Sequence, residues 1–264
     1  MTTPSHDYEG LCAVVTGSTS GIGEATACAF GAAGASVVVT GRRSSEGQRV
    51  VDKVDAAGGT AIFVAADVRS SDQIDSVVEA AITTFGRLDF AFNNAGIFDR
   101  MQDFHSYDDD AWDAIISVNQ TAVFRCMKAE LSAMLASPTR PVGGASIVNC
   151  ASTVAHRGSD RASPAYVASK HAVIGLTRQA AIQYANDGIR VNAVSPGPTL
   201  TEVAAPLIAE GPDAVRSTLR GLNPREVFVD AKDVADAVLY LCSPSASMIN
   251  GQDIALDGGQ LAML

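Results

Sequence analysis

Hydrophobic residues along the chain occur in two arrangements that alternate with each other. Short continuous apolar runs, many of them β-branched, predict buried strands near residues 11–15, 35–40, 61–65, 88–92, 145–151, 189–195 and 252–256. Between these runs, apolar residues recur every three to four positions and predict helices near residues 24–33, 46–57, 71–85, 111–118, 120–136, 165–186 and 232–242. Because short turns join the two kinds of segment, the pattern predicts an α/β fold, a doubly wound sheet of parallel strands with helices on both faces.

The chain is predicted to be one domain over residues 1–264, since no Pro/Gly/Ser-rich linker or change in composition divides it. Its 47% hydrophobic and 18% charged residues are sufficient for a large core. Residues 1–10 are polar and are predicted to form a flexible tail. Residues 199–224 have weak periodicity and contain three prolines, so we predict a partly helical loop there that borders the substrate.

Charge and cysteine content argue against several classes of function. The net charge of −10 disfavours binding to nucleic acid or to an anionic membrane surface. The N-terminus lacks a basic stretch followed by an apolar segment, and the apolar runs are too short to span a bilayer, so we expect a soluble, cytoplasmic protein. The five cysteines lack the spacing of disulfide frameworks or Cys/His metal sites, which predicts free thiols and no metal.

A glycine-rich turn, TGSTSGIG from Thr16 to Gly23, joins the first predicted strand to the first predicted helix. This order of strand, glycine turn and helix is typical of a dinucleotide site. Gly17 permits the turn, Gly21 permits close approach of a pyrophosphate, and Gly23 lets the helix pack on the sheet. The glycine spacing by itself fits an ordinary turn equally well. A second turn, NNAG at 93–96, ends the fourth strand at the edge where doubly wound sheets bind ligands.

Three residues further along could form a proton-transfer site. Tyr166 and Lys170 are four positions apart on a predicted helix and therefore share one face, while Ser152 ends the fifth strand. Since a nearby ammonium favours a phenolate, Lys170 is expected to lower the pKa of Tyr166. Tyr166 would then exchange a proton with a carbonyl or alcohol oxygen to which Ser152 hydrogen-bonds. By itself, the Tyr–Lys spacing also fits a surface pair.

The ordered set of motifs resembles the short-chain dehydrogenase/reductase family, through TGxxxGxG at 16–23, NNAG at 93–96, Asn119, Ser152, Tyr166-x-x-x-Lys170 and Pro196-Gly197. The resemblance covers nearly the whole chain. It implies a Rossmann-type fold with a seven-stranded parallel sheet and a catalytic tetrad. In that tetrad Tyr166 is the acid/base and Ser152 orients the substrate. Lys170 bonds the nicotinamide ribose, and Asn119 supports a water-linked proton path to Lys170.

The resemblance also implies the residues that contact a nicotinamide dinucleotide, namely Gly17, Thr19, Ser20, Gly21, Ile22, Gly23, Arg42, Arg43, Asp67, Val68, Asn94, Ala95, Gly96, Tyr166, Lys170, Pro196, Gly197, Thr199 and Thr201. NAD-specific sites carry a carboxylate after the second strand, whereas this chain has Gly41 followed by Arg42 and Arg43. Arginines suit a 2′-phosphate, which favours NADP(H) and leaves NAD(H) possible. The alternative is that both arginines are solvated at a helix start, and Ser20 stands where many NADP-preferring relatives carry a basic residue.

These features favour an oxidoreductase that moves a hydride between NADP(H) and a small-molecule carbonyl or secondary alcohol. The alternatives are an NAD-dependent alcohol dehydrogenase of the same family and a non-catalytic dinucleotide-binding scaffold. The loop from Ser152 to Tyr166 is slightly longer than is common in the family. Apolar substrate contacts are expected from the loops after the fourth and fifth strands and from residues 199–224, at Phe98, Val154, Leu200, Val203 and Leu207.

Two further expectations concern the surface. The resemblance implies a homotetramer in which the helices near 120–136 and 165–186 pack across a two-fold axis and residues 261–264 approach another subunit. His105 and His156 lie in predicted loops where they could touch the substrate, although a solvated histidine is the commoner situation.

Overall fold

Seven parallel strands form one sheet in the part of the chain that the computed structural model describes, residues 7–201, 208–220 and 222–263. They are β1 (Cys12–Thr16), β2 (Ser36–Gly41), β3 (Thr60–Ala65), β4 (Phe90–Asn93), β5 (Ala145–Cys150), β6 (Ile189–Pro196) and β7 (Asp253–Leu256). Their order across the sheet is β3-β2-β1-β4-β5-β6-β7. The strand order reverses between β1 and β4, the point at which doubly wound sheets bind ligands. The predicted fold class is confirmed.

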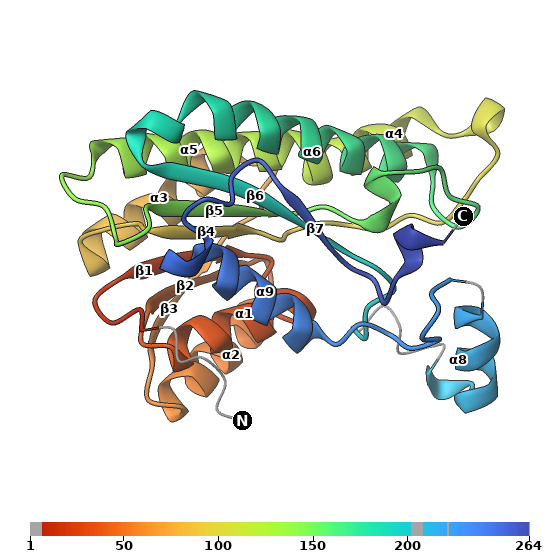
Figure 1. Ribbon diagram of the computed structural model, residues 1–264, viewed down its shortest axis with the longest axis horizontal. Helices are drawn as coiled ribbons and strands as arrows, with labels where there is room; N and C mark the ends of the chain where they lie inside the picture. The colour runs from red at the N-terminus through yellow and green to blue at the C-terminus, as the bar shows by residue number, and fades with distance from the viewer. Residues whose placement is uncertain (1–6, 202–207, 221, 264) are drawn as a thin grey trace.

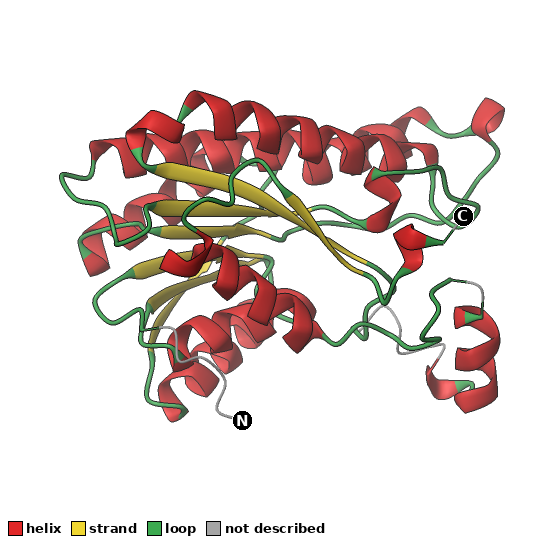
Figure 2. Ribbon diagram, viewed as in Figure 1, coloured by secondary structure: helices red, strands yellow, loops and turns green. Residues whose placement is uncertain are grey.

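Helices cover both faces of the sheet (Figures 1 and 2). One face carries α1 (Gly21–Ala32), α2 (Ser44–Ala56) and α9 (Ala231–Cys242). The other carries α3 (Ser71–Phe85), α4 (Asp109–Ile116), α5 (Ala122–Ala136) and α6 (Pro164–Gln183). A further helix, α8 (Pro212–Leu219), stands to one side of these layers in Figure 1. The short 3-10 turns are η1 (Phe104–Ser106), η3 (Thr153–Ala155), η4 (Ala185–Asp187), η6 (Pro244–Ala246) and η7 (Gln260–Ala262).

Alternating side chains of the strands build a core on each face of the sheet. In β1, Val14 packs in the layer of α3, α5 and α6, whereas Val15 packs in the layer of α1 and α9. Val38 and Val39 of β2 divide in the same way. All four side chains are almost fully buried. Strands buried on both faces have continuous apolar runs, which is why the sequence predicted them without period-two alternation.

The helical region around Asn119 differs from the prediction of two separate helices. Helix α4 continues into α5 through a π-helical turn, η2 (Ser117–Thr121). Asn119 is buried there, and its Oδ1 accepts a hydrogen bond from the Ile97 N–H while its Nδ2 donates one to the Ile97 carbonyl, both at 2.8 Å. These tertiary contacts hold Asn119 in an irregular turn that periodicity along one segment does not reveal, and such turns are frequent at functional sites.

Tyr8 lies within the segment predicted to be a flexible tail, yet its side chain is only 1% exposed. Its ring centroid lies 5.8 Å from that of Phe30 and 5.0 Å from that of Phe90. Its hydroxyl donates a 2.5 Å hydrogen bond to the Leu239 carbonyl. The tail prediction is therefore wrong at Tyr8, because a single aromatic residue among polar neighbours anchors the segment in the core.

Most element ends lie within three residues of their predicted positions. Helix α1 begins at Gly21, because the last glycines of the turn already have helical hydrogen bonding. Helix α6 ends at Gln183, and Gly188, with a φ of 69°, follows η4. Part of the predicted loop 199–224 is helical, as α8, while residues 202–207, with the predicted contacts Val203 and Leu207, lie outside the described residues. Within the described ranges, no helix combines the length and the apolar character that crossing a membrane requires.

Candidate active site

The glycine turn after β1 leaves no room for side chains at two of its glycines. Gly17 has a φ of 64°, in the left-handed region, and a Cβ added there would lie 2.8 Å from Ala95 Cα. A Cβ added at Gly23 would lie 2.7 Å from Asn94 Nδ2. Both contacts come from the NNAG turn after β4, so the two predicted motifs pack directly against each other.

Asn94 holds these two turns together. Its Nδ2 donates hydrogen bonds of 3.1 Å to the carbonyls of Thr16 and Gly17. In return, Thr16 Oγ1 accepts hydrogen bonds from the backbone N–H groups of Asn94 at 3.0 Å and Ala95 at 3.1 Å. The carboxyl ends of β1 and β4 are therefore fixed relative to each other at the switch point of the sheet.

The first turn of α1 fits the pyrophosphate of a dinucleotide. Ser20 is the N-cap residue, but its side chain accepts no hydrogen bond from the helix, so the first backbone N–H groups are not capped by it. Such N–H groups and the helix dipole attract an anion. Gly21 and Ile22 begin the helix at this point. A Cβ at Gly21 would lie 3.2 Å from Thr201 Cγ2, so Thr201 lies against the same turn.

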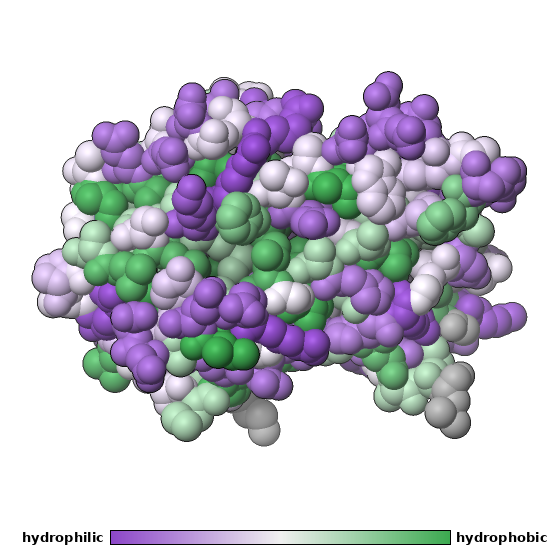
Figure 3. Space-filling view, turned by 90° about the horizontal axis from the view of Figure 1, so that it is seen from above, coloured by the Kyte–Doolittle hydropathy of each residue, from purple (hydrophilic) through white to green (hydrophobic). Residues whose placement is uncertain are grey.

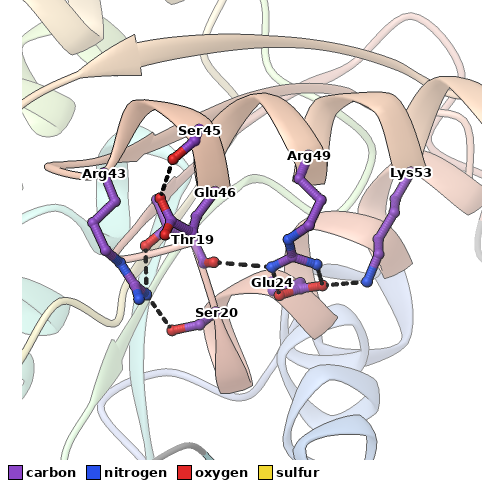
Figure 4. A network of polar contacts seen from close by, with 8 residues as sticks. All are labelled: Thr19, Ser20, Glu24, Arg43, Ser45, Glu46, Arg49 and Lys53. Atoms are coloured by element: carbon purple, nitrogen blue, oxygen red, sulfur yellow. Dashed lines mark hydrogen bonds and ion pairs between the residues drawn. The ribbon is translucent and has the colours of Figure 1, made fainter.

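Arg43 reaches from the end of β2 to the glycine turn, as Figure 4 shows. Its Nη2 donates hydrogen bonds to Thr19 Oγ1 at 3.2 Å and to Ser20 Oγ at 2.8 Å. Arg42 is exposed in the same turn. The hydrogen bond from the Arg69 side chain, with a small contribution from the charge of Arg42, holds the pKa of the Asp67 carboxyl at about 2. Of the two predicted arginines, Arg43 is the one that hydrogen-bonds to the glycine turn in the described structure.

A second group of charges lies further along α2 (Figure 4). Arg49 donates two 2.7 Å hydrogen bonds to the Glu24 carboxylate, and Lys53 donates a third of 2.7 Å. Mainly through the bond from Arg49, these contacts hold the pKa of Glu24 below its usual value although the side chain is partly buried. The negative charge in the first turn of α1 is thus neutralised, which removes its repulsion of a phosphate.

Gly41, at the end of β2, is in close contact with Thr19. A Cβ added at Gly41 would lie 2.7 Å from Thr19 Cγ2. An aspartate at this position, as NAD-specific sites require, would therefore displace Thr19. Close packing against Thr19 therefore favours glycine at position 41, independently of whether the cofactor carries a 2′-phosphate.

Asp67 and Val68, predicted near the adenine, follow β3. The Asp67 carboxylate accepts a 2.5 Å hydrogen bond from Arg69 Nη2, and the Asp67 N–H donates to Gln73 Oε1 at 2.7 Å. Val68 lines a small internal cavity together with Glu130. Among the described residues, no hydrogen bond joins Asp67 or Val68 to the glycine turn, and their contact with adenine stays a prediction.

The segment after β6 lies close to the C-terminal strand. The Gly197 N–H donates to the Leu256 carbonyl at 2.9 Å, and Thr199 Oγ1 donates to the Gly197 carbonyl at 2.9 Å. A Cβ at Gly197 would lie 3.1 Å from Asp257 Cα. The chain leaves β6 at Pro196, which is buried, and these contacts hold the segment that follows. The segment continues through Thr199 to Thr201, which lies against the glycine turn.

Lys170 and Asn119 converge on Gly96. A Cβ added at Gly96 would lie 3.4 Å from Asn119 Oδ1 and 3.7 Å from Lys170 Nζ. Lys170 is 4% exposed and donates a 2.8 Å hydrogen bond to the Cys150 carbonyl at the end of β5. Burial lowers the pKa of its ammonium. Three residues that the sequence places far apart thus meet at one edge of the sheet.

Tyr166 lies one helical turn before Lys170, whose Nζ is 5.7 Å from the centre of the tyrosine ring. Burial, with a smaller contribution from the Cys150 thiol, raises the pKa of the Tyr166 phenol to about 12, and a hydrogen bond with Ser152 opposes the rise. The expected lowering of this pKa by Lys170 is not observed, and burial is the main cause of the rise. At neutral pH the phenol therefore keeps its proton and can donate it.

Apolar side chains lie on the predicted substrate side of the site. Phe98 packs edge-on against Tyr166, with ring centroids 5.1 Å apart, and is still 47% exposed. Leu200 is 46% exposed, and Val154 is partly buried in η3. An exposed aromatic ring beside the Tyr166 phenol fits an apolar substrate.

Several residues that shape the site were missed in the sequence analysis. Ser18 Oγ donates to the Val15 carbonyl at 2.7 Å and accepts from the Thr40 N–H at 2.9 Å, which fastens the glycine turn to β2. The Cys150 carbonyl, which accepts from Lys170, carries no sequence signal because every residue has a carbonyl. A serine inside a glycine-rich turn was a usable signal, since serine often bonds nearby backbone groups.

The sequence is similar to known proteins over nearly its whole length. A family model described as enoyl-(acyl carrier protein) reductase matches residues 17–260. The A-factor type γ-butyrolactone 1′-reductase (1S-forming) of Streptomyces virginiae is 41% identical over 257 residues, which cover 96% of this chain and 98% of that protein. The cyclohexanol dehydrogenase of Acinetobacter sp. (strain SE19) is 38% identical over 254 residues, which cover 96% of each chain.

A solved structure has the same fold and a bound dinucleotide. It is from Agrobacterium tumefaciens, is assigned as a 2-deoxy-D-gluconate 3-dehydrogenase and holds NADP. The two structures superpose with a TM-score of 0.85 at 32% sequence identity, over 99% of this chain and 100% of that one.

Proposed function

Because the chain belongs to the short-chain dehydrogenase/reductase family and is an NAD(P)-dependent oxidoreductase, we propose that it uses NADP(H) to interconvert a ketone and a secondary alcohol. The observation that carries the proposal is the meeting of Asn119 and Lys170 at Gly96, one helical turn from Tyr166. A glycine turn that fits a dinucleotide ends at the same edge of the sheet.

In the proposed reaction, Tyr166 donates its phenolic proton to the substrate carbonyl oxygen during reduction and takes a proton back during oxidation. Ser152 hydrogen-bonds the same oxygen and stabilises the negative charge that develops on it. When bound, the nicotinamide ring supplies or accepts the hydride. Lys170, whose ammonium is buried, would bond the ribose of the nicotinamide, and Asn119 would support the proton path to Lys170.

The preference for NADP(H) is supported by the charges at the end of β2. Gly41 supplies no carboxylate to repel a 2′-phosphate, and Arg43 is held at the glycine turn by Ser20. A charge-assisted hydrogen bond from an arginine to a phosphate is worth about 1.5–3 kcal/mol, or roughly ten- to a hundredfold in affinity. The related A. tumefaciens structure holds NADP. NAD(H) is the alternative cofactor.

The test is turnover of a panel of ketones and aldehydes that includes cyclohexanone, chosen because one relative is a cyclohexanol dehydrogenase. Oxidation of NADPH and of NADH is followed by nicotinamide absorbance. We expect higher kcat/KM with NADPH. Equal or better efficiency with NADH on one substrate would overturn the cofactor proposal. Binding of NADPH without turnover of any substrate in the panel would favour a dinucleotide-binding scaffold.

Variants at the end of β2 sharpen the cofactor test. Arg43→Ala should lower kcat/KM for NADPH by roughly tenfold or more and leave NADH nearly unchanged. Arg42→Ala is the matched comparison and should have the smaller effect. Gly41→Asp should shift the preference toward NADH, most cleanly when combined with Thr19→Ser, which removes the methyl group that the new Cβ would meet. An unchanged preference in Arg43→Ala would contradict this assignment.

We also propose a homotetramer, with α5 and α6 at a two-fold interface. Figure 3 shows hydrophobic patches among hydrophilic ones on the face seen from above, the side on which these helices lie in Figure 1. Phe124 and Leu135 of α5 and Ile182 of α6 are 52%, 42% and 78% exposed. Self-complementary faces of this kind suit closed symmetry. Light scattering that gives a monomer mass at micromolar concentration would overturn this part.

A cytoplasmic location belongs to the same proposal. All five cysteines are free thiols, and four of them are buried. Free thiols are typical of proteins in a reducing compartment.

A further inference from the structure

The loop between β5 and α6 contains Ser152 near its start and leads into the first turn of α6, which contains Tyr166. Both are catalytic residues in the proposed function. The second half of the loop is fixed by backbone hydrogen bonds to the segment after β4. The Met101 N–H donates to the Arg161 carbonyl at 3.0 Å, and the Ser163 N–H donates to the Asp99 carbonyl at 3.1 Å. These bonds do not reach the first half of the loop, which contains Ser152. Other contacts must therefore fix that half.

His156 provides such a contact with the edge strand β7. Its Nε2 is hydrogen-bonded to Asp253 Oδ2, and Ser195 Oγ of β6 donates to the same oxygen at 2.7 Å. The Asp253 side chain is 4% exposed, whereas that of His156 is 33% exposed. The other carboxylate oxygen, Asp253 Oδ1, is buried and has no hydrogen-bond partner among the residues that the structure describes. The loop residue thus covers a carboxylate that belongs to the rigid sheet.

A short series of hydrogen bonds joins His156 to the catalytic hydroxyl. The His156 N–H donates to the Thr153 carbonyl at 3.3 Å, and the Ala155 N–H donates to the Ser152 carbonyl at 2.9 Å. Ser152 Oγ accepts from the Val154 N–H at 3.4 Å. These bonds join Ser152 and His156 to the two ends of the 3-10 turn η3, so a side chain that fixes one end of the turn also restrains the hydroxyl at the other.

Stability alone is a poor explanation of the buried carboxylate. Burying a carboxylate with one oxygen unpaired costs free energy, and such pairs often contribute little net stability. Val194 and Ile254, on the opposite face of the same two strands, are packed in an ordinary apolar core. The His156–Asp253 pair is therefore better explained by a role in orienting the loop than by a contribution to the free energy of unfolding.

We propose that His156, Asp253 and Ser195 form a clasp that positions the Ser152 hydroxyl for the reaction. His156 and Asp253 are positioning residues in this proposal, since they act through the 3-10 turn. The inference deepens the proposed function, because it assumes that Ser152 stabilises charge on a substrate oxygen. It also predicts a property that does not depend on turnover, the order of the loop around residue 157.

The activity test uses His156→Ala and the conservative variant His156→Gln, which keeps an N–H donor for Asp253. We expect His156→Ala to lower kcat about tenfold, part of the loss that follows removal of an oxyanion donor. The dissociation constant for NADPH should not change. His156→Gln should recover most of the loss. In a Ser152→Ala background, His156→Ala should cause no further loss, since the hydroxyl that it positions is gone. His171→Ala, an exposed histidine of α6, is the matched control.

The second test measures cleavage by trypsin after Arg157, the exposed residue that follows His156. Fragment masses at early times identify cleavage at this bond. We expect faster cleavage in His156→Ala, and in Asp253→Asn to a smaller extent, than in the wild type and in His171→Ala. This test does not require a substrate. If no substrate is found, the proposed function fails, but the cleavage rates still show whether His156 and Asp253 hold the loop in place.

Several results would overturn the clasp. One is cleavage after Arg157 that is unchanged in His156→Ala. Another is faster cleavage of His156→Ala with an unchanged kcat, because the contact of His156 with Asp253 would then order the loop without positioning Ser152. A third is an equal loss of kcat in the wild-type and Ser152→Ala backgrounds, because the effect would then not pass through Ser152. If His156→Ala does not fold, the same measurements of kcat and of cleavage after Arg157 are made on His156→Gln and Asp253→Asn, and their results test the proposal.

Discussion

Glu130 is a carboxylic acid in the protein interior, and replacing it with glutamine is expected to stabilise the protein above neutral pH. The side chain lies on the inner side of α5 and is 1% exposed. It accepts a 2.9 Å hydrogen bond from Asn93 Nδ2. Burial raises its pKa from 4.5 to about 7, although the bond from Asn93 opposes the rise.

The size and the sign of the effect follow from these two pKa values. Between them the folded protein binds a proton that the unfolded chain releases, so the free energy of unfolding falls as pH rises through this window. Moving a pKa from 4.5 to about 7 corresponds to about 3 kcal/mol, since a tenfold change in an equilibrium constant is worth about 1.4 kcal/mol. Glu130→Gln carries no charge and should recover about 3 kcal/mol near pH 8 and almost nothing near pH 4.5.

The structure around Glu130 accepts an amide. Asn93 Nδ2 can donate to the oxygen of the new amide as it does to the Glu130 carboxylate. The volume of the side chain is nearly unchanged, which avoids a new cavity or overpacking. The expected gain is therefore electrostatic, and it should depend on pH.

The assay is unfolding in urea, followed by circular dichroism at one protein concentration and at several pH values between about 4.5 and 8. Glu79→Gln makes the same charge change on the exposed side of α3 and should alter the free energy of unfolding by less than about 0.5 kcal/mol at every pH. A Glu130→Gln variant that is less stable than the wild type near pH 8, or whose gain does not vary with pH, would refute the reasoning.

Two other substitutions test the site and the core. Tyr166→Phe should keep dinucleotide binding and lose about a hundredfold or more in kcat, because it removes the transferred proton and keeps the ring; a variant with more than roughly a tenth of wild-type kcat would contradict the mechanism. Tyr8→Phe should lower the free energy of unfolding by about 1–3 kcal/mol, since it leaves the buried Leu239 carbonyl without its 2.5 Å hydrogen bond while the ring contacts remain. A change near zero in urea unfolding would show that this hydroxyl contributes no net stability.

The fold and much of the site could be predicted from the sequence because they depend on local signals. Unbroken apolar runs predict strands buried on both faces, and the carboxyl ends of parallel strands meet at one edge. The glycine turn at 16–23, the NNAG turn at 93–96 and Ser152 each follow such a strand, so their positions along the chain already predict that they share one region. Tyr166 and Lys170 share a face because they are one helical turn apart.

The tertiary structure alone decided which side chains occupy the same desolvated space. The pKa of Tyr166 is raised mainly because burial desolvates its phenol, and spacing along a helix does not reveal that burial. Asn119 enters a π-helical turn because Ile97, from a distant segment, bonds both ends of its amide. Tyr8 is buried although its neighbours in sequence are polar.

The same reason explains why the sequence did not predict the partners of these charged groups. Periodicity tells which face of an element is apolar, but not which charged group of another element will lie opposite. Arg43 reaches Ser20, and His156 reaches Asp253 across 97 positions of the chain, because the strand order brings these ends together. A desolvated charge gains or loses free energy according to the partners within a few ångströms of it, and those partners are set by packing between distant segments.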